Sequence, residues 1–68
     1  MAARVIVNGR EMSVDLPSTL KAFLVAQDLP PRSVVVELNG EAVAASEIAT
    51  HELHPGDQLE VVRVVAGG

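Results

Sequence analysis

The stretch from Gln58 to Val65 constrains the fold most, because it is the longest β-branched run in a chain of only 68 residues. β-Branched residues favour strands, and the run follows a cluster of turn-forming residues, His54-Pro55-Gly56-Asp57. We therefore expect it to form the central strand of a sheet. A chain of this length makes one small domain, in which every large apolar residue is needed in the core.

Two strands joined by a tight turn are predicted at the start of the chain. Residues Arg4 to Val7 are typical of a strand, and Asn8-Gly9 tolerates the positive φ angles of a type I′ turn. From Met12 to Leu16, apolar residues alternate with polar ones, which places the apolar side chains on one sheet face. We expect this second strand to end near Pro17.

A short helix is predicted next. Ser18 or Thr19 can cap its N-terminus, and Pro30 disfavours helical geometry at the preceding residue, so the helix should end near Asp28. Three apolar residues share the spacing of one helical face that would pack on the sheet: Leu20, Phe23 and Leu24.

The second half of the chain reads mainly as strands. Ser33 to Leu38 contains three consecutive valines, and this lack of alternation indicates a strand buried on both faces or nearly so. Asn39-Gly40 supplies a second tight turn, after which Glu41 to Val43 is expected to return as a brief strand. Between Ala44 and Leu53, one helical turn is expected around Ser46-Glu47-Ile48.

This order of elements predicts an α+β fold of the β-grasp type. A hairpin, a helix and a later strand give a right-handed crossover, which lets the last strand lie between earlier ones and parallel to the first. The result is a mixed sheet of four to five strands packed on one main helix. We expect residues 1–65 to form this domain and residues 66–68 to be a flexible tail.

Composition excludes several functions. A formal net charge of -4 and a single aromatic residue disfavour nucleic-acid binding. The chain has no cysteine, so any reactive sulfur must come from another molecule. No signal peptide or membrane span is recognisable, which makes the cytoplasm the default compartment and a membrane partner unexpected.

The remaining polar residues do not suggest a catalytic or metal site. His51 and His54 are three residues apart, but the pattern around them indicates a strand and a turn, so we interpret them as solvated. No close pair of carboxylates resembles a general acid and base. Five acidic residues are predicted to form a solvated surface that can face a basic partner: Glu41, Glu47, Glu52, Asp57 and Glu60.

Chemistry is instead predicted at the C-terminal carboxylate of Gly68. Ala66-Gly67-Gly68 follows the last strand directly and has no side chain larger than a methyl group, so it can enter a narrow active site. Adenylation by ATP would convert the carboxylate into a mixed anhydride, from which a sulfur nucleophile can displace AMP. The alternative is that this tail is merely a frayed end.

Four segments resemble the ThiS family of sulfur carriers, within the ubiquitin-like ThiS/MoaD group: Val7-Asn8-Gly9, Glu37-Leu38-Asn39-Gly40-Glu41, Gly56-Asp57 and Val65-Ala66-Gly67-Gly68. The resemblance spans essentially the whole chain. It departs from the family at Ile48, where many relatives have an aromatic residue, and at Ala44-Ala45.

The resemblance implies a ubiquitin-like β-grasp fold and a carrier that is acted on by enzymes rather than an enzyme itself. A ThiF-like, E1-like enzyme would use ATP to adenylate Gly68, a donor protein would supply sulfur, and the resulting thiocarboxylate would serve a ThiG-like thiazole synthase in thiamine biosynthesis. No stably bound cofactor and no metal are expected. Ala66, Gly67 and Gly68 would enter the partners' active sites, and the apolar sheet face would be the dock.

Four other functions are compatible with the residues. A MoaD-like carrier for molybdopterin synthesis has a similar fold and diglycine end, although such chains tend to carry a Phe-Pro-Pro type segment where this one has Val62-Arg63-Val64. A carrier for another sulfur-containing product and a protein-tagging modifier are further alternatives. A β-grasp interaction module with an inert tail belongs to a different class, and it would keep its activity without Gly68.

Overall fold

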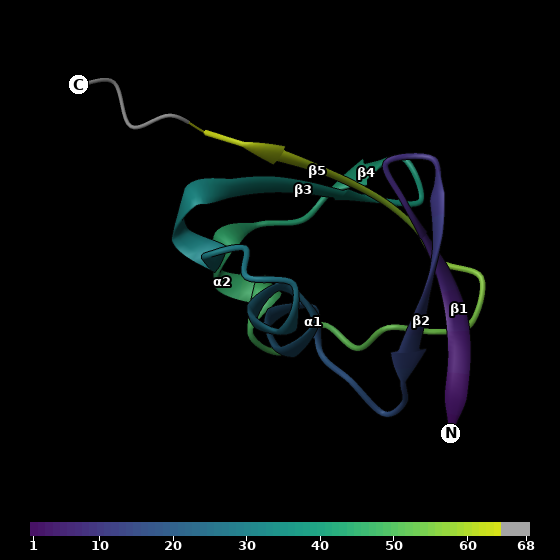
Figure 1. Ribbon diagram of the computed structural model, residues 1–68. Helices are drawn as coiled ribbons and strands as arrows, with labels where there is room; N and C mark the ends of the chain where they lie inside the picture. Colours follow the sequence, from purple (N-terminus) through teal and green to yellow (C-terminus); the bar gives the residue numbers. More distant parts are fainter. Residues whose placement is uncertain (65–68) are drawn as a thin grey trace.

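The computed structural model describes residues 1–64 as a five-stranded mixed sheet with its helices on one face (Figure 1). In chain order the elements are β1 (Ala2–Val7), β2 (Arg10–Asp15), α1 (Leu20–Ala26), the 3-10 turn η1 (Pro31–Ser33), β3 (Val34–Leu38), β4 (Glu41–Ala42), α2 (Ala45–Ile48) and β5 (Gln58–Arg63). The expected tail, residues 66–68, and Val65 lie outside the described residues.

The sheet confirms the predicted β-grasp topology. Its strand order is β2-β1-β5-β3-β4, so the last strand of the chain is the central one. β5 runs parallel to β1 and antiparallel to β3. In Figure 1, β3 and β5 lie over the helices while β1 and β2 turn away to the side, so the sheet curls around α1.

Two asparagine side chains extend the pairing of β5 beyond its neighbouring strands. Asn8 follows β1, and its Oδ1 accepts from the Val61 N–H at 2.9 Å while its Nδ2 donates to the Val61 carbonyl at 3.1 Å. Asn39 follows β3, and its Oδ1 accepts from the Gln58 N–H at 2.9 Å. Both residues have positive φ, 50° and 51°, which asparagine tolerates better than most residues. The predicted Asn-Gly turns therefore also fix the central strand.

The helix α1 begins and ends as the sequence predicts. Thr19 is the N-cap, and its Oγ1 accepts from the Ala22 N–H at 3.1 Å. Asp28 adopts a positive φ of 60° just past the helix, and the Leu29 N–H donates to the Leu24 carbonyl at 2.8 Å. These bonds satisfy end groups that lack partners inside the helix.

The core lies between α1 and the inner face of the sheet. Val5, Leu20 and Leu24 are fully buried, and the remaining buried apolar residues surround them: Val7, Val14, Phe23, Val34, Val36, Ile48, Leu53, Leu59 and Val61. The short helix α2 confirms the helical turn predicted around Ile48. The segment after α2 is tied to the start of α1, because the Leu20 N–H donates to the His51 carbonyl at 2.8 Å.

One prediction about β3 is wrong. Its three valines suggested a strand buried on both faces, but only Val34 and Val36 are buried, whereas Val35 is 50% exposed. The helices cover one face of the sheet only, so every second residue of β3 points outward.

Within residues 1–64, the structure contains no helix long and apolar enough to cross a membrane.

Replacing Asn8 with alanine should destabilise the fold by about 2–3 kcal/mol. About 1 kcal/mol is expected for each of the two lost hydrogen bonds to Val61, and alanine at positive φ adds about 1 kcal/mol of strain. Urea unfolding measures the change. Asn8→Gly is the matched control, because it loses the same bonds without the strain and should fall between Asn8→Ala and the wild type. Equal unfolding midpoints for all three would contradict this role.

Candidate docking site at the end of the central strand

The end of β5 is held firmly by the segment that precedes β3. Arg63 pairs with Val34 in the sheet register, and the Val64 N–H donates to the Ser33 carbonyl at 2.7 Å. The backbone is therefore positioned up to Val64, four residues before Gly68. The predicted site residues Ala66, Gly67 and Gly68 lie outside the described residues, so their role stays a prediction.

The outer face of the sheet exposes valines beside this strand end. Val35 of β3 and Val62 of β5 are directly opposite in the register and are 50% and 61% exposed, and the neighbouring Val64 is 48% exposed. We call Val35, Val62 and Val64 the outer valine patch. Exposed apolar side chains that lie next to one another are a feature of protein contact sites.

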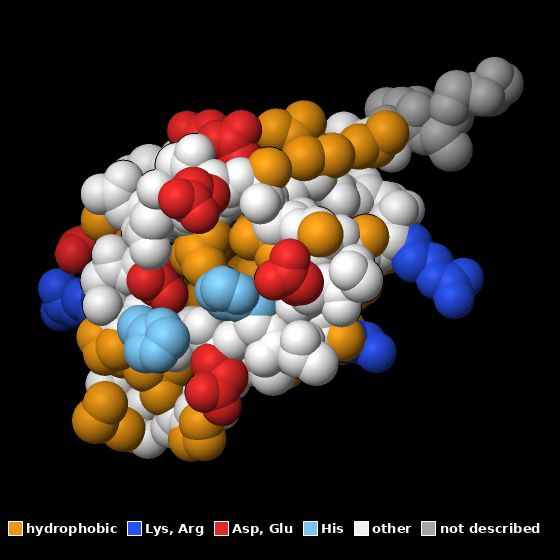
Figure 2. Space-filling view, turned by 180° about the vertical axis from the view of Figure 1, so that it is seen from behind, with side chains coloured by type: hydrophobic (Ala, Val, Ile, Leu, Met, Phe, Trp, Pro, Cys, Tyr) orange, Lys and Arg blue, Asp and Glu red, His pale blue; other side chains and the backbone are white. Residues whose placement is uncertain are grey.

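Two acidic residues border the outer valine patch. Glu37 and Glu60 are directly opposite each other in the β3–β5 register, and both are exposed. Neither forms an ion pair within residues 1–64. Figure 2 shows acidic and apolar side chains next to each other along the edge formed by β3 and β5. Like charges in directly opposed positions destabilise a strand pair, so this arrangement suits a partner that brings a cation.

Asp57 corrects the predicted acidic surface. Glu41, Glu47, Glu52 and Glu60 are exposed as expected, but Asp57 is buried, with 8% exposure. Its Oδ1 accepts from the Asn39 Nδ2 at 3.0 Å, and its Oδ2 accepts from the His54 N–H at 2.7 Å. The Asp57 carboxylate thus stabilises the turn that leads into β5 and does not form part of the acidic surface.

The histidines are not brought together into a metal site. The His54 side chain is exposed, and its Nδ1 lies 3.9 Å from the buried Asp57 Oδ2. His51 is half-buried, and its carbonyl holds the start of α1. In the part of the chain that the structure describes, no three His, Cys, Asp or Glu residues are placed to hold a metal ion.

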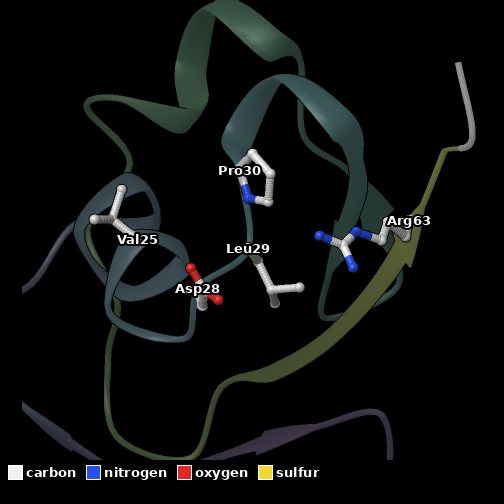
Figure 3. A pocket seen from close by; sticks show the side chains of 5 residues that line it. All are labelled: Val25, Asp28, Leu29, Pro30 and Arg63. Atoms are coloured by element: carbon white, nitrogen blue, oxygen red, sulfur yellow. The ribbon is translucent and has the colours of Figure 1, made fainter.

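Arg63 is a surface residue that the sequence pattern did not single out. It lies on the inner side of β5, where its side chain extends toward Leu29 at the edge of a cavity of about 240 Å³ (Figure 3). Val25, Asp28 and Pro30 complete the lining. The alternation of β5 indicates that Arg63 points inward. It does not indicate that Arg63 meets the segment after α1, because that segment is remote in sequence.

Replacing Glu60 with glutamine should stabilise the free protein by about 0.5 kcal/mol, because it removes the repulsion from Glu37. Thermal unfolding at low salt measures the gain, which should shrink as salt screens the charges. Glu11→Gln is the control, since the Glu11 carboxylate lies 3.7 Å from the Arg4 guanidinium and its removal should bring no gain. An unchanged or lower stability of Glu60→Gln would rule out repulsion between the opposed carboxylates.

The comparisons with known proteins agree with this architecture. Residues 4–68 match the ThiS family. The crystal structure of a thiamine biosynthesis protein, ThiS, from Geobacter metallireducens has a TM-score of 0.80 and 28% identity, covering 96% of this chain and 99% of that one. An NMR structure of a thiamine biosynthesis protein from the same organism has a TM-score of 0.77 at 28% identity, covering 96% and 87%.

A longer relative is also similar. A thiazole synthase from Paramagnetospirillum magneticum is 34% identical over 65 residues, which are 96% of this chain but only 20% of that protein. The chain thus spans about one fifth of the length of this curated relative. The match over residues 4–68 and the shared β-grasp fold place the chain in the ThiS family of sulfur carriers.

Proposed function

We propose that this chain carries sulfur for thiazole formation in thiamine biosynthesis, as a thiocarboxylate on Gly68. The observation that carries the proposal is the family match, which runs through Gly67 and Gly68. The thiamine product is favoured over molybdopterin because the similar proteins are a thiazole synthase and thiamine biosynthesis proteins. In this role the chain is a protein co-substrate of its partner enzymes.

The proposed chemistry has two steps and needs a free carboxylate on Gly68. First, a carboxylate oxygen attacks the α-phosphorus of ATP on a ThiF-like enzyme, and pyrophosphate leaves. Second, a sulfur nucleophile adds to the acyl carbon and AMP leaves. With hydrosulfide as the nucleophile, the product is the thiocarboxylate directly. The chain has no cysteine, so the sulfur comes from a donor protein in the cell.

The outer valine patch is the proposed dock of the adenylating enzyme. It lies on the outer face beside the end of β5, so an enzyme that covers Val62 and Val64 is in position to receive the residues that follow. Glu37 and Glu60 lie beside the patch, and we expect cationic side chains on the docking face of the enzyme to meet them.

A ThiG-like thiazole synthase is the proposed sulfur acceptor. The thiazole synthase of Paramagnetospirillum magneticum contains a segment similar to this chain, which makes up about one fifth of its length. Two activities on one polypeptide act at a high effective concentration. We infer that the domain described above meets such a synthase through a surface contact.

The intact protein should gain about 16 mass units when it is incubated with ATP, its ThiF-like enzyme and sulfide, because one oxygen of Gly68 is replaced by sulfur. Intact-mass spectrometry reads the change. A variant without Gly68 should show no gain, because Gly67 then ends the chain one residue short of the reacting position. An unchanged mass of the full chain, with an enzyme that is active on another carrier, would leave an interaction module as the better interpretation.

Val62→Asp should slow adenylation about tenfold or more without unfolding the protein, because it places a charge within the apolar dock but alters no core residue. ATP–pyrophosphate exchange measures the step. Val25→Asp is the matched control, since Val25 is 59% exposed, close to the 61% of Val62, but lies on α1 beneath the sheet. Equal adenylation rates for the two variants would exclude the outer valine patch as the dock of the adenylating enzyme.

A further inference from the structure

Two exposed surfaces on opposite sides of this domain carry opposite charges. On the outer face of the sheet, Glu37 and Glu60 lie beside the outer valine patch. On the helix side, Lys21 of α1 and Arg32 of η1 are exposed. None of these four side chains forms an ion pair within residues 1–64. Each surface therefore offers two charges to a partner.

The two cations border a cavity of about 380 Å³ among α1, η1 and α2. Ile48 lines the cavity and is buried, and the remaining lining residues are also apolar: Pro30, Pro31, Ala45 and Ala49. We call this cavity and its two cations, Lys21 and Arg32, the cationic groove. It joins apolar contact area to positive charge.

Two acids are close in sequence to the elements of the cationic groove, but neither lines it. Asp28 lines the smaller neighbouring cavity, where the Arg63 guanidinium offsets its charge (Figure 3). Glu47 of α2 is exposed and lines a different cavity, between α2 and β4. The positive charge on the helix side is therefore concentrated at the cationic groove, and the smaller cavity adds no net charge to it.

The outer valine patch and the cationic groove complement each other in polarity and in charge. The patch presents three exposed valines next to two carboxylates, and the groove presents an apolar lining next to two cations. A contact between them buries apolar area and brings carboxylates to cations. The helices cover only one face of the sheet, so patch and groove cannot meet within one molecule (Figure 1). They can meet between two copies.

We propose that this chain associates with a second copy of itself, head to tail, with the outer valine patch of one copy on the cationic groove of the next. The two contacting surfaces differ, so each end of the pair keeps one of them uncovered and further copies can join. The contact involves few side chains, and the net charge of -4 on each copy opposes it. The association is therefore weak and requires a high protein concentration.

This association competes with the proposed dock of the adenylating enzyme, a consequence that rests on the proposed function. A copy whose outer valine patch is covered by its neighbour does not present that patch to the enzyme. In a concentrated solution, part of the carrier is thus protected from adenylation, and dilution releases it.

Sedimentation equilibrium tests the contact without any enzyme. The weight-average mass of the wild type should rise above that of one chain as its concentration approaches about 1 mM. Lys21→Glu/Arg32→Glu makes the groove acidic, and Glu37→Lys/Glu60→Lys makes the patch basic. Each variant alone should associate about tenfold or more weakly than the wild type. An equimolar mixture of the two should associate again, because contacts between unlike copies then join opposite charges.

Arg4→Glu/Arg10→Glu is the matched control, because it changes the net charge as much as the groove variant but lies on the β1–β2 hairpin. In physiological salt, which screens long-range repulsion, it should leave association within about twofold of the wild type. Circular dichroism shows whether each variant is folded. Lys21→Gln/Arg32→Gln replaces an unfolded groove variant and should also weaken association.

Three results overturn the contact. The first is a wild type that stays monomeric at the highest concentration. The second is a loss of association in the control equal to that in the groove variant, which would assign the effect to net charge. The third is a mixture that does not associate although the wild type does. A groove variant that associates normally while Val62→Asp does not shows a patch-to-patch contact and also overturns the proposal.

A competition experiment tests the protection from adenylation. An excess of a chain that lacks Gly68 and carries Val62→Asp should slow adenylation of the full chain, because its groove still covers the patch. Adding Lys21→Glu/Arg32→Glu to this competitor should remove the effect. Equal adenylation rates with both competitors would overturn the protection. Absence of any adenylation of the full chain, with association observed in the centrifuge, would overturn the proposed function and leave the contact standing.

Discussion

The rest of the structure depends on β5, which is hydrogen-bonded to neighbours on both sides. β1 pairs with one edge of β5 and β3 pairs with the other, while β2 and β4 extend the sheet beyond them. The regular ladder with β1 is short, with only two register pairs. Asn8 lengthens it through two bonds to Val61, and Asn39 strengthens the opposite edge at Gln58. Two turn residues thus complete the pairing of a strand that is far from both in sequence.

Local patterns were sufficient to predict much of this fold. The two Asn-Gly turns, the cap at Thr19 and the helix stripe each depend on residues within a few positions of one another, and all are confirmed. The central position of β5 was also predicted from its composition, because the most apolar strand of a small sheet buries the most apolar surface at the centre. These features need no knowledge of distant contacts.

The wrong predictions depend on contacts between segments that are remote in sequence. Three consecutive valines do not reveal which one faces water, and Val35 is exposed because the helices cover only one sheet face. Asp57 looked like surface charge because one of its partners, the Asn39 amide, is 18 residues away. The cations that line the two cavities on the helix side were missed for the same reason, since Lys21, Arg32 and Arg63 come from three separate elements. Gly68, by contrast, was proposed from its sequence position and chemistry.

The register of β5 determines which chemistry each face presents. Val62 and Arg63 are neighbours on one strand, so a slip of one residue would exchange their faces. The asparagine bonds to Val61 and Gln58 resist such a slip.

Because of these bonds, deamidation at the two Asn-Gly turns would affect how long the protein stays folded. Spontaneous loss of ammonia from asparagine begins when the following backbone nitrogen attacks the side-chain amide, and glycine hinders this attack least. At Asn8 the reaction would replace the Nδ2 donor, 3.1 Å from the Val61 carbonyl, with a carboxylate oxygen that repels it. Slow ageing at an exposed turn would therefore loosen the buried centre of the sheet.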